Sequence, residues 1–189
     1  MKYKISFLVL AFLYGCSHIK EDIKDIMEHN LSIPQNEMIS YSWSSQLDSV
    51  RTPNILSLIF YITKEQCQSC YFTELVKYER SNYEELKKNG VRIMYIIATD
   101  KLNKKKLEDE LINARIKGVA FLDTCNVFLE SNQHIPEKEL YHTFVCNNEG
   151  KILMVGNPFQ NEKMEALFKK VIANEQRKHK TKPANKRNE

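Results

Sequence analysis

Cys67 and Cys70 are the two residues whose type and spacing most directly suggest chemistry. They are separated by two residues and follow an apolar run, residues 55–62, after a four-residue gap. A helix-like segment without glycine or proline then runs to Lys88. Two thiols at this spacing, where a buried strand gives way to a helix, can form and break a disulfide within the chain. The sequence therefore predicts a redox couple.

The first cysteine is predicted to be the nucleophile. At a helix N-terminus the sulfur of Cys67 lies beside unpaired backbone N–H groups, and these groups together with the helix dipole favour a thiolate. The thiolate is the form that attacks a disulfide. Cys70, one turn further along the helix, is then the resolving thiol. The alternative is that the pair is a structural link, or two unpaired thiols, because the motif alone is weak.

Strand and helix patterns alternate along the rest of the chain. Apolar runs predict buried strands, and apolar residues at helical spacing predict amphipathic helices. A turn containing Asn147 and Gly150 predicts a β-hairpin. The length suits one domain with a real core. The predicted strands are 55–62, 91–98, 119–123, 141–146 and 151–156; the predicted helices are 70–88, 101–115 and 161–173, with a short helix or turn at 127–129.

This order of elements resembles the thioredoxin fold, and more narrowly the TlpA-like group of membrane-tethered redoxins. Residues 142–152 are similar to the Pro-Thr-Phe…Asp-Gly-Lys-Ile hairpin of that group. The resemblance covers residues 38–173 and implies an α/β protein with a three-layer α/β/α arrangement around a central mixed sheet. It implies disulfide exchange through Cys67 and Cys70 without a cofactor, and substrate contacts from His142 and Thr143.

Three departures from the family pattern favour a different class of function. His142 stands where the family has a cis-proline, and Gln66 and Ser69 replace a tryptophan and a proline beside the two cysteines. The strand at 55–62 carries no acid, and its clearest polar residue is Ser57. These differences suggest a slower or narrower reductase. They also support the alternative of a non-catalytic binding or structural module that kept the fold.

His142 adds a third hypothesis. If its imidazole faces the two thiols, then Cys67, Cys70 and His142 form a three-ligand set that can hold zinc or copper(I). Otherwise His142 is a spacer residue in an extended strand with an ordinary trans peptide. The chain is expected to have no metal site.

Cys125 and Cys146 are the remaining thiols of the expected mature chain. One follows a short predicted strand and the other ends a strand, so the pattern allows both to lie at the same edge of the sheet. They can pair in an oxidising compartment, or they can be two buried thiols, which is a common environment for free cysteine. Sequence alone does not decide between these alternatives.

The start of the chain resembles a bacterial lipoprotein signal. A basic segment and an apolar run of ten residues end in Leu13-Tyr14-Gly15-Cys16, and the run is too short to span a bilayer. The resemblance implies that residues 1–15 are removed and that Cys16 is acylated. Residues 16–37 are then a membrane-proximal tether, or form a short helix, since Ile19, Ile23, Ile26 and Met27 recur at helical spacing. The protein is expected in the cell envelope, where its partners are exported protein disulfides and an electron donor.

The basic charge of the chain belongs to its two ends. The net charge is +4, but residues 175–189 hold six Lys or Arg against two acids, and residues 1–15 add two more lysines. This leaves −2 for residues 16–174, so the body of the chain lacks the charge of a nucleic-acid-binding domain. Residues 174–189 carry almost no apolar side chains and are predicted to be a basic disordered tail.

Overall fold

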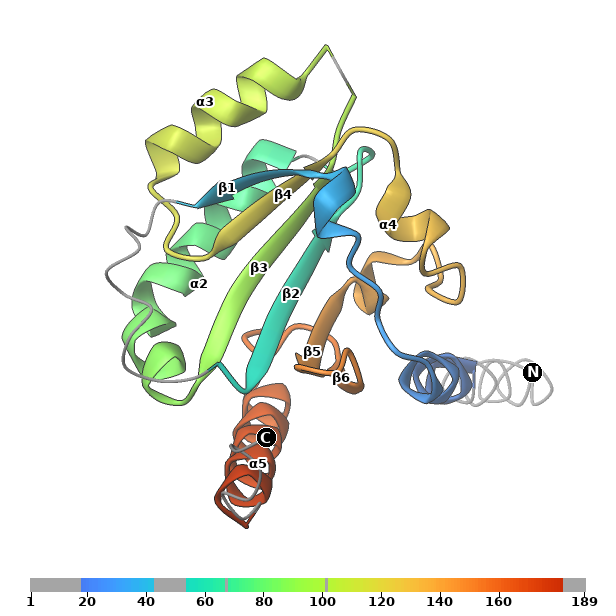
Figure 1. Ribbon diagram of the computed structural model, residues 1–189, viewed down its shortest axis with the longest axis vertical. Helices are drawn as coiled ribbons and strands as arrows, with labels where there is room; N and C mark the ends of the chain where they lie inside the picture. Colours follow the sequence, from blue (N-terminus) through green and yellow to red (C-terminus); the bar gives the residue numbers. More distant parts are fainter. Residues whose placement is uncertain (1–17, 43–53, 67, 101, 182–189) are drawn as a thin grey trace, which may run out of the picture.

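The computed structural model describes residues 18–42, 54–66, 68–100 and 102–181, with only the backbone described for residues 68–71. Six strands and four labelled α-helices alternate along the described chain (Figure 1). The strands are β1 (Ile39–Ser42), β2 (Leu56–Ile62), β3 (Val91–Ala98), β4 (Val119–Asp123), β5 (Thr143–Asn147) and β6 (Ile152–Val155). The helices are α2 (Gln68–Lys88), α3 (Lys104–Ala114), α4 (Val127–Glu130) and α5 (Glu162–Thr181), with short 3₁₀ turns η1 (Gln35–Glu37) and η3 (Glu139–Tyr141).

The strands form one mixed sheet in the order β1-β4-β3-β2-β5-β6. β2, β3 and β4 are parallel, whereas β1, β5 and β6 run antiparallel to their neighbours. Phe60 in the central strand β2 lies opposite Tyr95 on one side and Thr143 on the other. The strands and helices predicted from the apolar pattern are confirmed, with end shifts of a few residues. The short edge strand β1 was not predicted, because it holds only four residues of mixed polarity.

The strand β2 is buried at all seven positions because both faces of the sheet are covered. On one face its side chains belong to a core cluster that includes residues of α2, α3 and α5. On the other face they belong to a cluster that includes residues 18–38, α4 and the segment before β5 (Figure 1). The two successive strand–helix–strand crossovers proceed in the same direction across the sheet, so α2 and α3 lie on the same face. The predicted three-layer arrangement is confirmed.

A buried carboxylate ties α2 to the start of β4. Glu79 is 1% exposed, and its carboxylate accepts hydrogen bonds from the backbone N–H groups of Lys117 at 2.9 Å and Gly118 at 2.6 Å. A Cβ at Gly118 would lie 2.6 Å from the carbonyl oxygen of Ile93, so this close approach requires glycine. Burial raises the pKa of Glu79, and the two N–H donors oppose that shift.

Residues 18–38 are part of the folded domain, which corrects the predicted tether at 16–37 for all but its first two residues. Residues 18–28 are helical, and Ile26 is fully buried against the sheet. The backbone N–H of Leu31 donates to the carbonyl oxygen of Gly150 at 2.8 Å, and Asn30 forms a bridge with Lys151. The apolar residues of this segment recur at helical spacing and cover a sheet face that the long helices leave open.

The last helix is longer than predicted. α5 continues to Thr181, so residues 174–181 are helical rather than a disordered tail. Glu175 is 5% exposed and pairs with Lys178, and the side chain of Gln176 donates to Asn89. These contacts, together with the basic last turn beside the negative end of the helix dipole, extend the helix beyond its apolar stripe. Residues 182–189 lie outside the described chain.

Within the described residues, no helix combines the length and the apolar character needed to cross a bilayer. The predicted signal segment at 1–15 and the predicted lipidation site Cys16 lie outside these residues.

Candidate functional site

The predicted dithiol falls at the junction of β2 and α2. β2 ends at Ile62, and the side chain of Gln66 closes the following turn by accepting a hydrogen bond from the N–H of Thr63 at 2.8 Å. α2 begins at Gln68, and the backbone of Cys70 lies in its first turn. Cys67, which directly precedes α2 in the sequence, is outside the described residues, as is the side chain of Cys70. The positions of the two sulfur atoms therefore stay a prediction.

The start of α2 has the electrostatics that favour a thiolate. The helix is 21 residues long and has no acidic residue in its first turn, so no nearby carboxylate of that turn opposes the positive end of its dipole. Its last turn carries Lys87 and Lys88, which complement the negative end. A thiol placed at the N-terminus of such a helix has a lowered pKa.

His142 ends the turn η3 and directly precedes β5. Its backbone has φ −89° and ψ 15°, which is not extended, so the expectation of an extended strand residue is wrong. No cis peptide bond occurs among the described residues, so His142 is joined to its neighbours by ordinary trans peptides. Its carbonyl oxygen accepts a hydrogen bond from the N–H of Tyr61 at 2.8 Å, which fixes the residue against the end of β2.

The imidazole of His142 is buried with one nitrogen unpaired. The side chain is 2% exposed, and its Nε2 lies 3.0 Å from the carbonyl oxygen of Pro136. A carbonyl oxygen can only accept, so Nε2 carries the hydrogen. Burial lowers the pKa of His142, which keeps the ring neutral and leaves Nδ1 as an acceptor. This Nδ1 is buried and has no hydrogen-bond partner among the described residues.

His142 lines a cavity of about 510 Å³ at the edge of the sheet where β2 and β3 end. We call it the edge cavity. Ligands of open α/β sheets commonly bind beyond the carboxyl ends of the parallel strands. The lining comes from the turn after β2, the end of β3, α4 and the segment around η3: Tyr61, Thr63, Lys64, Glu65, Ala98, Asn126, Leu129, Glu137, Glu139 and His142.

The edge cavity has an acidic character. Its lining includes three carboxylates and one lysine. The pKa of Tyr61 is raised by burial and then by the charges of Asp123 and Glu65, and Glu139 acts on the ring of His142. Lys64 instead contributes to lowering the pKa of Asp100, which lies outside the lining. The cavity is thus better suited to a positive group than to a negative one.

Thr143, the second predicted substrate-binding residue, belongs to the sheet. It lies opposite Phe60 in the β2–β5 ladder, and its carbonyl oxygen accepts a hydrogen bond from the N–H of Gly156 at 2.8 Å. Its side chain is buried, and it is not part of the cavity lining. Of the two predicted residues, the structure therefore brings only His142 to the edge cavity.

Sequence reasoning missed most of this lining. Tyr61 lies within the predicted strand 55–62 and Glu65 follows it, and neither position has a pattern that indicates a cavity. Glu137 and Glu139 had no recognisable signal, because they reach the cavity through a segment that crosses the opposite face of the sheet from α2. The one available indication was Pro136, which marks a turn close before β5.

Within the described residues no three His, Cys, Asp or Glu side chains are arranged to hold a metal ion. The hypothesised zinc or copper set needs Cys67 and the side chain of Cys70, which are not described, so that hypothesis is untested.

The other two cysteines are both free. Cys125 is exposed, and Cys146 is buried, which raises the pKa of its thiol to about 12. The two cysteines do not lie at a common edge of the sheet. Cys125 follows the carboxyl end of β4, whereas Cys146 lies opposite Ser57 near the amino end of β2. Because β5 runs antiparallel to β2, the end of β5 is at the opposite edge of the sheet.

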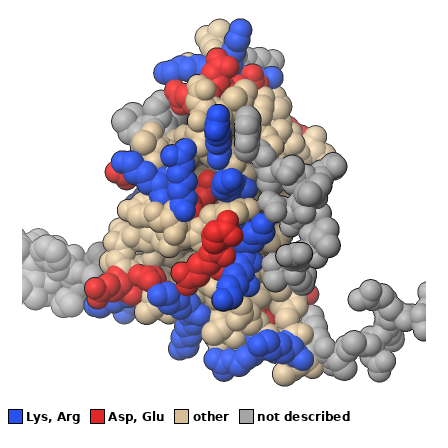
Figure 2. Space-filling model, turned by 90° about the vertical axis from the view of Figure 1, so that its left-hand side faces the viewer, with Lys and Arg blue, Asp and Glu red and all other residues tan. Residues whose placement is uncertain are grey.

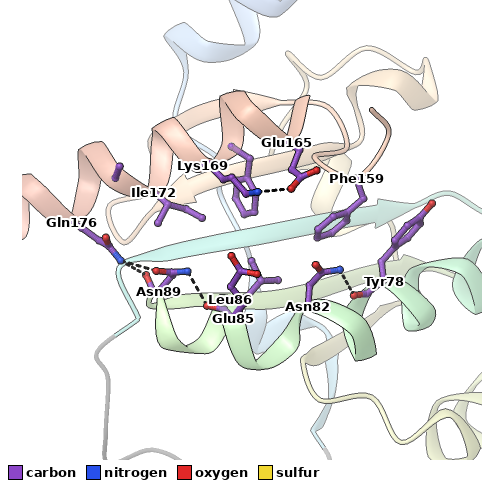
Figure 3. Close-up of a pocket in the computed structure, with 12 residues that line it drawn as sticks. Tyr78, Asn82, Glu85, Leu86, Asn89, Phe159, Glu165, Lys169, Ile172 and Gln176 are labelled. Carbon is purple, nitrogen blue, oxygen red and sulfur yellow. Dashed lines mark hydrogen bonds and ion pairs between the residues drawn. The ribbon is translucent and has the colours of Figure 1, made fainter. Parts of the chain in front are cut away.

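A second cavity, of about 420 Å³, lies between α2 and α5 (Figure 3). We call it the α2–α5 groove. Its floor is apolar and includes Leu86, Phe168 and Ile172, and Tyr78 stacks on Phe159 at its rim with 5.3 Å between ring centroids. Polar rim side chains bind one another or the helix backbone: Gln176 donates to Asn89, Asn89 to the carbonyl oxygen of Glu85, Asn82 to that of Tyr78, and Lys169 pairs with Glu165.

The surface charge of the body is mixed. On the face formed by α2 and α3, positive and negative side chains are interspersed (Figure 2). Several of them form pairs within α3, such as Lys104 with Glu108 and Lys106 with Glu110. This face therefore does not carry the continuous basic surface that a nucleic-acid interface requires.

Comparison with known proteins shows the fold. An uncharacterised thioredoxin-like protein from Porphyromonas gingivalis superposes with a TM-score of 0.50 at 15% identity, over 75% of this chain and 90% of that one. A putative thiol:disulfide interchange protein from Chlorobium tepidum gives 0.48 at 14% identity, over 63% and 81%. The thioredoxin domain of a thiol-disulfide oxidoreductase from Bacteroides vulgatus gives 0.46 at 16%, over 63% and 80%.

The assignment depends on the first of these structures and on the sheet order described above. The chain has a thioredoxin-like fold. No protein-family model matches its sequence, and no curated protein matches it.

Proposed function

We propose that this protein is a thiol–disulfide oxidoreductase that exchanges disulfides through Cys67 and Cys70. The observation that carries the proposal is the place of the Cys-X-X-Cys motif, at the junction of β2 and the long helix α2 of a thioredoxin-like fold. A thiol at that junction is activated by the helix N-terminus, and a second thiol one turn later can resolve the product.

The exchange proceeds in two thiolate attacks. The Cys67 thiolate attacks one sulfur of a partner disulfide; the partner S–S bond breaks, a mixed disulfide forms, and the released partner thiolate takes a proton. Cys70, as a thiolate, then attacks the Cys67 sulfur, forms the Cys67–Cys70 disulfide and releases the second partner thiol. The partner has gained two electrons and the protein has lost two. A donor dithiol restores the reduced pair by the same steps in reverse.

The proposed place of action is the bacterial cell envelope, with the protein anchored through a lipid on Cys16. The support is the lipoprotein-like pattern of residues 1–16 in the sequence. The expected substrates are disulfides of exported proteins. Labelling cells with a radioactive fatty acid checks the anchor: wild-type protein should be labelled and Cys16→Ala should not.

The proposed reaction predicts that the chain from Ser17 onward reduces insulin disulfides in the presence of dithiothreitol. Cys67→Ser should abolish that activity, because the attacking thiolate is gone. Cys125→Ser is the matched control, since it removes an exposed thiol outside the pair and should leave the rate unchanged. Full activity of the Cys67→Ser protein would refute the proposed function.

A non-catalytic binding module is the second candidate. It is favoured by the trans peptides around His142 and by the absence of an acid from β2. The reduction potential of the Cys67–Cys70 couple distinguishes the two candidates. A value below about −300 mV is typical of a structural disulfide and would support the binding module, whereas working exchangers have less reducing potentials.

A further inference from the structure

We propose that the edge cavity binds a cationic side chain, arginine or lysine, of the protein whose disulfide is exchanged. The inference rests on the proposed function for the identity of that protein, and it adds the chemical class of the substrate. The proposal rests on the acceptors that the cavity presents, which are three carboxylates against a single lysine and the unpaired Nδ1 of His142.

Three carboxylates line the cavity from two separate segments. Glu65 comes from the turn after β2, and Glu137 and Glu139 come from the segment around η3. None of the three forms an ion pair with another described residue. Ionised carboxylates are acceptors only, and the lining holds three of them against one lysine, Lys64, so negative charge and acceptor capacity are in excess.

The buried histidine is independent of these carboxylates and supports the same conclusion. His142 lines the cavity, and its Nδ1 is an acceptor without a partner among the described residues. Buried polar atoms are nearly always hydrogen-bonded, so an unpaired one indicates a missing donor. A donor entering the cavity is the group placed to reach this ring. A carboxylate could not serve, since it would bring only further acceptors.

The carboxylates of the lining also suit a guanidinium group. A guanidinium is planar and presents five N–H donors that bind carboxylates two at a time, and three carboxylates line the cavity. A lysine ammonium provides fewer donors and no such plane, so arginine should bind more tightly than lysine.

The cavity is close in sequence to the proposed nucleophile. Glu65 precedes Cys67 by two residues. An extended chain spans about 3.3–3.6 Å per residue, so a side chain bound near Glu65 belongs to a residue only a few positions from the partner's cysteine. The inferred substrate is therefore a disulfide with arginine or lysine beside it in the partner sequence.

A binding experiment tests the inference without any redox step. The chain from Ser17 onward contains all the described elements, and N-acetyl-arginine amide is the probe, with the neutral isostere N-acetyl-citrulline amide as its control. NMR titration should show a saturable chemical-shift change of the His142 imidazole with the arginine probe. The affinity of the citrulline probe should be at least about fivefold lower. Equal shifts with both probes, or no shift with either, would overturn the inference.

Substitutions locate the binding in the same titration. Glu139→Gln and Glu65→Gln keep the side-chain volume and remove the charge, so each should lower the affinity for the arginine probe. Glu162→Gln removes an exposed charge at the start of α5 and should have no effect. If Glu162→Gln lowers the affinity for the probe as much as Glu139→Gln does, the probe responds to the charge of the whole surface. The edge cavity is then not its binding site.

A kinetic experiment then separates the inference from the proposed function. Two peptides with the same disulfide ring are compared, one with arginine and one with glutamate next to each cysteine. The arginine peptide should be reduced with kcat/KM about tenfold higher at low salt, and Glu139→Gln should reduce that preference. Reduction of neither peptide would refute the proposed function and leave the titration to decide the inference. Equal rates for both would overturn the inference alone.

Discussion

The edge cavity and the α2–α5 groove are similar in volume, at about 510 and 420 Å³, but their polar groups differ in hydrogen bonding. In the groove, rim side chains such as Gln176 and Asn89 bind one another over an apolar floor (Figure 3). In the edge cavity, the acceptor His142 Nδ1 is buried without a described partner. The groove is therefore a junction between two packed helices, whereas the edge cavity has a hydrogen-bond acceptor that a ligand can use. Unmet hydrogen-bonding capacity, rather than volume, distinguishes the two.

The largest expected effect on stability is in the groove. Phe168 is 3% exposed and packs edge-on against Phe159. Phe168→Ala should lower the free energy of unfolding by about 3–5 kcal/mol, because it removes buried apolar surface and leaves a cavity. Urea denaturation measures this loss. Leu167→Ala is the matched control, since Leu167 is 45% exposed and its truncation should cost far less.

The same variant also tests whether the groove binds the substrate. Phe168→Ala should leave the affinity for the arginine probe unchanged under conditions in which the protein is folded. A loss of affinity that exceeds the unfolded fraction would show that the groove takes part in binding.

The next prediction concerns the unpaired histidine. His142→Phe removes an unsatisfied buried acceptor but also loses the hydrogen bond to Pro136, so the free energy of unfolding should change by no more than about 1 kcal/mol. Affinity for the arginine probe should fall, because the acceptor is gone. A variant that is strongly destabilised, or that binds the probe as the wild type does, would contradict this assignment of His142.

The smallest expected effect is a dependence of stability on pH. Burial lowers the pKa of His142, and burial with the charge of His29 lowers that of His134, whose ring stacks on His29 at 4.5 Å between centroids. The unfolded chain binds these protons first, near pH 6.5. Stability should therefore be full above this pH and decline as the pH falls towards the lower folded-state values.

Urea denaturation between pH 7.5 and 5 measures that decline in stability. Two variants show how much of it is due to His134 and how much to His142. His29→Asn removes the neighbouring charge and should reduce the part due to His134. His142→Phe should reduce the part due to the cavity. A profile that is unchanged in both variants would assign the dependence to other groups.

Much of the fold could be predicted from the sequence because local patterns specify it. The apolar runs at β2 and β3 are buried on both faces, so they appear as continuous stretches, and Asn89-Gly90 ends α2 where a helix stop is expected. The edge strand β1 lacks a comparable signal, and the helical spacing of residues 18–28 does not show where that segment packs. Each is specified by a surface elsewhere in the chain: β4 for the strand, and an uncovered sheet face for the helix.

The position of the dithiol along the chain can be predicted locally, because a Cys-X-X-Cys motif between a buried run and a helix is a short-range pattern. The residues that surround this position depend on tertiary contacts. Glu65 and Glu139 are 74 positions apart and meet at one cavity because β5 returns antiparallel beside β2. The same reversal places Cys125 and Cys146 at opposite edges of the sheet. Such contacts depend on strand order and direction, and these follow from the packing of the whole chain rather than from any local pattern.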